Sequence, residues 1–367
     1  MKSAVRSCLV LAAALCAGGL SAPVAAQSGA SAAPNIPAIK FKCNSPLPKA
    51  SYTSAMMDFF TTALTQLSGG KITVDSFYAG ALFTFGEEAG SLGKGIADCG
   101  VFSTNYSPGI MPVTADGVSL GWAFTYDTAS DLPNLPVIGQ IVRDETSKNA
   151  GFITIAGTPG VVPFFMKKLP PKGFAAEPLS ETLKGMRISA AASYGEFART
   201  FGATVVSVPS PEVALAYRTG QLDGNFTSYD SWLAIKDEAP VVFRQENIVP
   251  LGLGFNANKF NSMPREVRQI ILRAGLIASQ KTAAREKARV LAILGDLKPP
   301  KYTVVEPSAR EREIWIETMK KVQWAPFAAK GPVQASWVEA VNNLQKSYTP
   351  SWERPNYTPE WWGPLLR

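Results

Sequence analysis

The chain has 367 residues, of which 18% are charged and 46% hydrophobic, and its formal net charge is +7. Its Lys and Arg residues are scattered, with no run of five or six, which argues against a nucleic-acid-binding patch. Histidine is absent, which removes the usual general base of Ser-His-Asp and Cys-His enzymes and the commonest zinc ligand. These absences disfavour an enzyme of those classes, and we expect no cofactor or metal.

The first 26 residues have the pattern of a secretory signal. Two basic residues precede an apolar run over Leu9–Leu20, and Val24-Ala25-Ala26 is a small-residue cleavage site. The run is short for a membrane span. Cys16 follows a leucine, where a lipoprotein signal has a small residue, so soluble export is favoured over a lipid anchor. We expect cleavage after Ala26 and a disordered leader over residues 27–37.

Two cysteines remain in the expected mature chain, Cys43 and Cys99. Two cysteines alone cannot complete a structural zinc site. An oxidising compartment would allow them to pair, and both lie near strands that we expect side by side. Because bridging neighbouring parallel strands is geometrically awkward, two buried thiols are favoured over a disulfide.

The first half of the chain predicts strands that alternate with helices. The helix over residues 51–67 ends at Gly69-Gly70, which is a typical C-terminal stop. The stretch Gly157–Gly160 (GTPG) is expected to be a hinge crossing, because glycine and proline interrupt regular structure there. The expected strands cover residues 38–43, 71–77, 97–103 and 152–156, and further helices cover residues 86–95 and 135–148.

The centre of the second half predicts a β-α-β-α unit. A strand over Met186–Ser189 leads to a helix that ends near Gly202, and a strand over Thr204–Val208 leads to a helix opened by Ser210-Pro211-Glu212. This alternation favours a parallel sheet covered on both faces, whose ligands bind at the carboxyl ends of the strands. Strands over 241–250 and 251–256 follow, then a long helix starting at Pro264, a strand over 302–305 and a helix over 308–321.

The residues of this central unit resemble a known family. Leu183-Lys184-Gly185-Met186-Arg187, Phe201-Gly202-Ala203, Glu212, Gly220 and Asp223-Gly224 are similar to the motif of the TRAP-transporter substrate-binding proteins, the DctP-like receptors. The stretch GGKITVDSFYAGALFTFGEEAGSLGKGIADCGVFSTNY resembles an earlier region of the same family. The resemblance extends, more thinly, over residues 38–320.

The resemblance implies an α/β, two-lobed periplasmic-binding-protein-like fold with crossing hinge strands and a long bracing helix. We expect domain I over residues 38–160 plus 249–290 and domain II over residues 161–248 plus 291–345. Residues 346–367 are expected to form a C-terminal strap. The resemblance also implies a periplasmic receptor that binds a small organic acid and delivers it to the subunits of a membrane permease.

The expected ligand anchor is Arg187, since the matching family arginine clamps the substrate carboxylate with paired hydrogen bonds. Other positions depart from the family: Val162-Pro163-Phe164-Phe165 replaces a second arginine, Thr227 an asparagine and Phe226 a glutamate. We therefore expect one carboxylate with an apolar or aromatic body. The candidate walls are Phe102, Phe164, Phe226, Tyr194 and Trp122, and the candidate hydrogen-bonding residues are Tyr106, Ser103, Thr227 and Tyr229.

Two other functions are compatible with parts of the sequence. An exported α/β hydrolase is disfavoured, because neither a G-x-S-x-G elbow nor a histidine is present. A receptor of an ABC transporter or of a sensor system would have a similar fold and ligand, and would differ only in its membrane partner.

Overall fold

The computed structural model describes residues 35–170, 181–190, 192–208 and 212–367, which belong to one compact unit, Pro34–Arg367. The expected signal peptide, most of the expected leader and the expected helix start at Ser210-Pro211 lie outside the described residues. No helix in the described ranges has the length and apolar character needed to cross a membrane.

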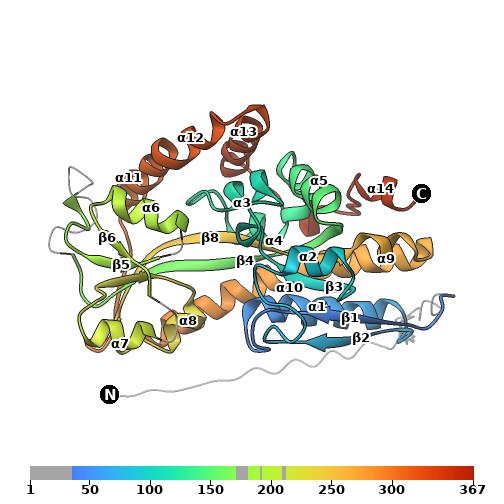
Figure 1. The fold of residues 1–367 in the computed structure, drawn as a ribbon, viewed down its shortest axis with the longest axis horizontal. Coiled ribbons are helices and arrows are strands. Elements are labelled where there is room, and N and C mark those ends of the chain that lie inside the picture. The colour runs from blue at the N-terminus through green and yellow to red at the C-terminus, as the bar shows by residue number, and fades with distance from the viewer. Residues whose placement is uncertain (1–34, 171–180, 191, 209–211) are drawn as a thin grey trace, which may run out of the picture. The chain divides into compact units, whose positions relative to one another are not determined.

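One mixed sheet runs through the described part of the chain (Figure 1), with strand order β2-β1-β3-β8-β4-β7-β5-β6 and β9 paired to β8. We call the end that carries β1–β3 lobe I and the end that carries β5–β7 lobe II. The strands are β1 (Ile39–Asn44), β2 (Ile72–Phe77), β3 (Cys99–Phe102), β4 (Phe152–Met166), β5 (Arg187–Ser189), β6 (Thr204–Val206), β7 (Gly224–Phe226), β8 (Val241–Asn256) and β9 (Thr303–Val305). This is the expected α/β architecture with crossing strands.

The two longest strands, β4 and β8, form an antiparallel ribbon that passes from lobe I to lobe II. Separate strands were expected on either side of Gly157–Gly160 and on either side of Pro250, and that prediction is wrong, because both segments continue without a break. Gly157 pairs with Gly252 inside the ladder. A Cβ atom on Gly157 would lie 2.5 Å from the carbonyl oxygen of Ala129, so glycine is required there for close packing and not for a turn.

Helix α10 (Arg265–Asp296) is the expected long bracing helix. With 32 residues, it extends for about 48 Å. Its first half packs along α1 (Tyr52–Leu67), which the Ser51 side chain caps, and the apolar side chains of that half belong to the core of lobe I. Further along α10, Val290 belongs to the core of lobe II. The helix therefore contributes to both lobes.

The remaining helices cover both faces of the sheet, with α6, α11, α12 and α13 on one side and α7, α8 and α10 on the other (Figure 1). Their bounds are α2 (Glu88–Gly93), α3 (Pro112–Val118), α4 (Tyr126–Ser130), α5 (Ile138–Asn149), α6 (Ala192–Thr200), α7 (Val213–Arg218), α8 (Tyr229–Leu233), α9 (Ala257–Asn261), α11 (Ala309–Met319), α12 (Ala325–Ala328), α13 (Pro332–Lys346) and α14 (Trp362–Leu365).

A disulfide joins Cys43 of β1 to Cys99 of β3, which corrects the preference for two free thiols. The two residues stand directly opposite each other in the parallel pairing, with their Cα atoms 4.5 Å apart. That separation lies within the range that a disulfide spans. The bridge therefore ties together neighbouring strands of lobe I.

The C-terminal residues pack back onto lobe I. Trp362 of α14 is buried in the core of that lobe. Arg268 of α10 donates a hydrogen bond to the carbonyl oxygen of Arg367 at 3.0 Å, and Arg265 donates one to that of Leu366 at 3.0 Å. The last residues are thus held against the first turns of α10.

Candidate functional site

The direction of the strands in lobe II decides which strand ends face lobe I. Strand β4 enters lobe II from lobe I and ends at Met166, which pairs with Gly224 at the start of β7. Because β7 is antiparallel to β4, it runs back from the outer end of lobe II towards lobe I. Strand β5 is parallel to β7, so its carboxyl end at Ser189 also points towards lobe I. Ligands in α/β proteins bind at such carboxyl ends.

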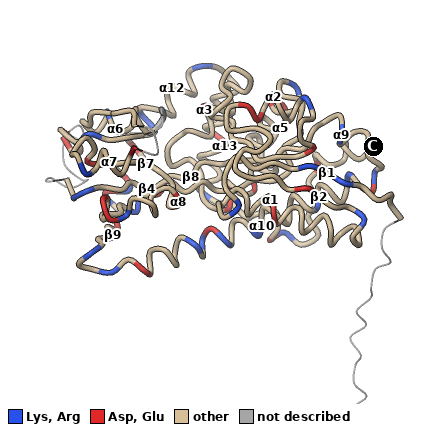
Figure 2. Tube along the Cα trace, turned by 60° about the horizontal axis from the view of Figure 1, so that its bottom comes forward, with Lys and Arg blue, Asp and Glu red and all other residues tan. Residues whose placement is uncertain are grey.

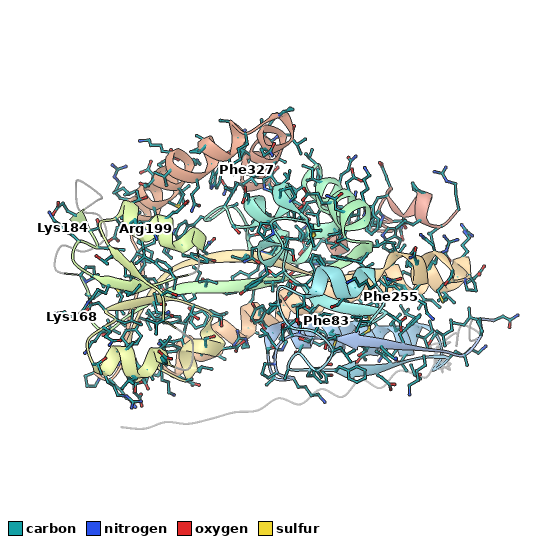
Figure 3. All side chains as sticks on the ribbon, viewed as in Figure 1. Phe83, Lys168, Lys184, Arg199, Phe255 and Phe327 are labelled. Atoms are coloured by element: carbon teal, nitrogen blue, oxygen red, sulfur yellow. A yellow bond between two sulfur atoms is a disulfide. The ribbon has the colours of Figure 1, made fainter. Side chains whose placement is uncertain are left out.

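Arg187 lies at the opposite end of this arrangement. It is the first residue of β5, and its backbone N–H donates to the Asp223 carboxylate at 2.9 Å, level with the start of β7. Lys168 lies near this pair, since its charge helps to lower the pKa of Asp223. Figure 3 shows Lys168 at the outer end of lobe II, far from Phe83 of lobe I. Arg187, the expected ligand anchor, therefore stands at the amino end of β5 and not at the carboxyl end, where ligands bind.

The Arg187 guanidinium already has a carboxylate partner. Its Nε and Nη2 atoms donate to the two oxygens of Asp223 at 3.0 and 3.3 Å, and 47% of its side chain is exposed. Partial burial raises the pKa of Asp223, but hydrogen bonds and charge from Arg187 outweigh that effect and lower the pKa below its ordinary value. The pair is an ion pair near the surface, typical of a structural contact.

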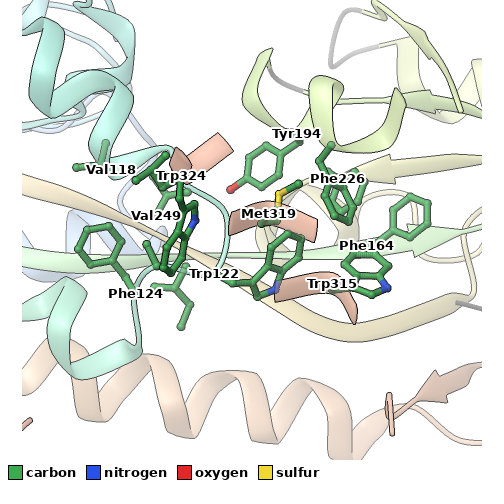
Figure 4. Close-up of a cluster of buried hydrophobic side chains, with 14 of the residues drawn as sticks. Val118, Trp122, Phe124, Phe164, Tyr194, Phe226, Val249, Trp315, Met319 and Trp324 are labelled. Carbon is green, nitrogen blue, oxygen red and sulfur yellow. The ribbon is translucent and has the colours of Figure 1, made fainter. Parts of the chain in front are cut away.

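Aromatic side chains gather where the strands of lobe II point towards lobe I. The Tyr194 ring on α6 stacks on Phe226 at the end of β7, with centroids 5.6 Å apart, and Phe226 stacks on Phe164 of β4 at 4.4 Å. Figure 4 shows the Tyr194 hydroxyl directed away from Phe226. The structure thus brings together three of the expected wall residues, and the ring of Phe164 is fully buried beneath the other two.

Trp122 belongs to the same aromatic cluster but comes from the segment between α3 and α4. Its ring lies 4.8 Å from Phe197 of α6, and its φ of +59° is rare for a bulky residue. Two residues of β8 hold it: the Asn247 Oδ1 atom accepts the Trp122 backbone N–H at 2.8 Å, and the Gln245 carbonyl accepts the indole N–H at 3.3 Å. Observed backbone strain of this kind often marks a functional site.

Electrostatic interactions link the hydroxyl of Tyr194 in lobe II to those of Tyr52 and Tyr106 in lobe I. Burial raises the pKa of the Tyr194 hydroxyl, and nearby Tyr52 and Tyr106 of lobe I raise it further. Burial also raises the pKa of Tyr52, as do the charges of Asp230 and Glu286, whereas Arg289 lowers it. These hydroxyls therefore remain protonated at neutral pH and serve as hydrogen-bond donors.

Several buried polar atoms near the lobe junction lack a hydrogen-bond partner among the described residues: Tyr194 Oη, Gln245 Oε1 and Asn225 Oδ1. Tyr194 is 8% exposed and Gln245 is 4% exposed. An unpaired polar group in such surroundings carries a desolvation cost of about 1–3 kcal/mol. Unpaired atoms of this kind are typical of a site that a ligand completes.

The other expected site residues are dispersed. Phe102 is fully buried, with its ring 4.7 Å from Phe152 in a core of lobe I, and Tyr229 is fully buried with its hydroxyl on Glu246 at 2.8 Å. Ser103 donates through its hydroxyl to Asn105, and Thr227 is partly exposed just after β7. Tyr106 is exposed and stacks on Phe85 at 5.0 Å.

A buried charge network, which was not expected, occupies the part of α10 that lies between the lobes. The Glu286 side chain is 0% exposed and pairs with Arg289 at 2.9 Å and with Arg285 at 2.5 Å. Arg289 also pairs with Asp230 of α8 at 2.6 Å. Burial raises the pKa of Glu286, while Arg289 and Arg285 oppose that rise. Charged residues of both signs are otherwise spread along the chain (Figure 2).

Two other features offer no comparable site. No group of three or more Cys, Asp or Glu side chains among the described residues is arranged to hold a metal ion. An open surface pocket of about 570 Å³ lies elsewhere, between α13 and the segment that follows it. Its lining residues are Pro136, Val137, Ala340, Asn343, Leu344, Ser347, Tyr348, Thr349 and Arg354.

Comparison with known families matches residues 180–330, which include β5–β9 and α11, to the DctP model, described as bacterial extracellular solute-binding protein, family 7. This chain therefore resembles that family of solute-binding proteins over residues 180–330. It is 22% identical over 280 residues to a solute-binding protein of Albidiferax ferrireducens, and the match covers 74% of this chain and 80% of the relative. Both matches agree with the expected family resemblance, and both are described as solute-binding proteins.

Solved structures share the fold of this chain. A TRAP periplasmic solute-binding protein from Desulfovibrio desulfuricans with bound sn-glycerol-3-phosphate has a TM-score of 0.70 and 19% identity, covering 87% of this chain and all of that one. An extracytoplasmic receptor from Bordetella pertussis that binds pyroglutamic acid has a TM-score of 0.67 and 21% identity, covering 83% and 100% of the two chains. The expected two-lobed architecture is confirmed.

Proposed function

We propose that this protein is the periplasmic receptor of a TRAP transporter, which binds a small organic acid between its lobes and delivers it to the membrane permease. The observation that carries the proposal is the stack of Tyr194, Phe226 and Phe164 at the strand ends that face lobe I, where Tyr52 of that lobe acts electrostatically on Tyr194. Such a junction between lobes is where a two-lobed receptor encloses a solute. In this proposal, export ends with cleavage after Ala26.

The proposed ligand is a monocarboxylate with an apolar or aromatic body. Stacked rings at Tyr194, Phe226 and Phe164 favour an apolar body. Protonated tyrosine hydroxyls can donate hydrogen bonds to one carboxylate, whereas the acidic groups near Tyr52 disfavour a second. Pyroglutamate and β-D-galacturonate, which are ligands of two structural neighbours, each carry a single carboxylate.

The proposed mechanism is closure of the lobes around the solute by a hinge movement. Three main-chain connections cross between the lobes in this proposal, namely β4, β8 and α10. Solute that contacts both lobes stabilises the closed form, because it binds that form more tightly than the open one. The closed form is the one that the permease would accept.

The proposal is tested with the full-length exported protein, purified from the periplasm and freed of solute by unfolding and refolding. Pyroglutamate, β-D-galacturonate, phenylacetate and succinate are screened by thermal shift and then by calorimetry. A ligand at 100 times its Kd should stabilise the native state by about 2.7 kcal/mol. If no organic acid raises the melting temperature and none is released on denaturation, as measured by mass spectrometry, the proposal is overturned. A clear preference for succinate would overturn only the monocarboxylate class.

A further inference from the structure

A hydrogen bond determines which end of the Asn247 amide faces Trp122. It is 1% exposed, and its Oδ1 atom accepts the backbone N–H of Trp122 at 2.8 Å. The amide Nδ2 group is therefore turned away from Trp122. Asn247 also lies beside Tyr194 and lowers the pKa of that hydroxyl, although burial and Tyr52 raise it more strongly. A hydrogen bond that lowers the pKa of a hydroxyl is one donated to its oxygen, so this effect agrees with an amide N–H that faces Tyr194.

With the amide N–H of Asn247 facing the Tyr194 oxygen, the O–H of Tyr194 remains free to donate to another group. A hydroxyl oxygen that faces an amide donor keeps its own O–H for another acceptor. No described group accepts from it, since Tyr194 Oη is buried without a completed hydrogen bond. The ring is held in place by the stack on Phe226 at 5.6 Å, so the hydroxyl direction is set by packing. A fixed donor without an acceptor is what a ligand-binding position requires before its ligand arrives.

We propose that the Tyr194 O–H is the donor that holds the acid group of the solute, and that Asn247 is the positioning residue that keeps it available. The proposal rests on the receptor function proposed above. Tyr52 of the facing lobe, which acts electrostatically on the Tyr194 hydroxyl, is a further donor in this proposal. The acid is held by uncharged donors, in place of the arginine clamp expected at Arg187.

Neutral hydrogen-bond donors and an arginine differ in how strongly salt affects the binding of a carboxylate. Binding of a carboxylate to a cation weakens as salt screens the attraction, whereas a hydrogen bond from a neutral hydroxyl is much less sensitive to ionic strength. We therefore expect the Kd to change by less than about twofold between low salt and about 0.5 M salt. The site also favours monoacids, because Asp230 and Glu286 act on Tyr52 together with Arg289, and these acids oppose a second negative charge.

The experiment compares Tyr194→Phe with the matched control Tyr302→Phe. The Tyr302 hydroxyl bonds Asp237 at 2.7 Å in the core region formed by α7 and α8, away from the proposed site. Calorimetry with the acid that the wild type binds most tightly should give an affinity loss of about tenfold for Tyr194→Phe and less than about twofold for the control. The melting temperature of ligand-free Tyr194→Phe should change little, because the lost O–H donates to no described group.

Asn247→Asp tests the positioning role. A carboxylate at this position would accept a hydrogen bond from the Tyr194 O–H. That O–H would then be unavailable to the solute, so affinity should fall by about tenfold or more. Tyr194→Phe in the Asn247→Asp background should then cause little further loss, which is a coupling that an unrelated structural defect would not produce. Equal affinity of Tyr194→Phe and wild type, or additive effects in the double variant, would overturn the proposal. Wild-type protein that binds no acid would instead overturn the receptor function.

Discussion

Two arginine–carboxylate contacts of this molecule have similar hydrogen bonds but different surroundings. At the outer end of lobe II, Arg187 pairs with Asp223 while 47% of its side chain remains exposed. Where α10 passes between the lobes, Arg289 pairs with Glu286, whose side chain is 0% exposed, and with Asp230. Water solvates the first pair and is largely excluded from the second.

The difference teaches that burial, more than geometry, decides what an ion pair does. An exposed pair contributes about 0–1 kcal/mol to stability, because solvent already satisfies both charges. A buried charge depends on its partner, since removal of that partner leaves a charge that solvent cannot reach. The two carboxyl pKa values also depart in opposite directions: Arg187 lowers that of Asp223, whereas burial raises that of Glu286 against the opposing effect of Arg289.

The largest expected effect comes from breaking the buried network. Arg289→Ala leaves Glu286 with only Arg285 as a cationic partner among its described contacts, and should reduce the free energy of unfolding by about 3–5 kcal/mol. Urea unfolding at neutral pH measures this loss. Adding Glu286→Gln to Arg289→Ala should restore part of the stability, because the unpaired charge is then gone. A loss below about 1 kcal/mol in the single variant would mean that solvent reaches Glu286.

An intermediate effect is expected in the pH dependence of stability. Since the folded pKa of Glu286 is raised above its unfolded value, the native state binds more protons in the window between them. The free energy of unfolding therefore falls as pH rises from the ordinary glutamate value of about 4.3 through the folded pKa. Glu286→Gln should remove this decline, as measured by urea unfolding across that window. An unchanged slope would contradict the assignment.

Asp223 should contribute the opposite slope. Its folded pKa is lowered, so its stabilising contribution is present above the unfolded value of about 3.9 and is lost as pH falls through the folded pKa. Asp223→Asn should therefore flatten the acid side of the stability curve. The contribution is small, since the pair lies near the surface. A steeper acid transition in the variant would show that the sign is wrong.

The smallest expected effect is that of Arg187→Ala. Because its partner is reached by solvent, the loss in free energy of unfolding should be below about 1 kcal/mol. Affinity for the acid bound by the wild type should change by less than about twofold, because the side chain lies at the outer end of lobe II. Calorimetry and urea unfolding measure the two quantities. A hundredfold loss of affinity would show that Arg187 does bind the ligand.

Local patterns predicted much of the fold. The helix over residues 51–67, the long helix that starts at Pro264 and the alternation of strands and helices are set by residues close together in the chain. The pairing of Cys43 with Cys99 depends instead on the register between two parallel strands, which no local pattern specifies. Similarly, β4 continues through Gly157 because packing against Ala129 requires a glycine there.

The candidate site was harder to predict because strand direction is non-local. Arg187 belongs to a correctly predicted strand, but which end of that strand faces lobe I follows from the pairing of β7 with β4. Asn247 and Gln245 were missed. Their signal was present, since a polar stretch at 244–247 interrupts an otherwise apolar strand over Val241–Asn256 and buried polar residues need a reason.

The β4–β7 and β4–β8 pairings also bear on how this protein can be dissected. The DctP-matched segment, 180–330, includes β7 and β8 but not β4, which pairs with both of them. Expressed alone, that segment would present open sheet edges along two strands, and open edges recruit other chains. The portion most readily recognised by sequence comparison is thus not an autonomous folding piece, and shortened versions of this protein should keep the whole ribbon.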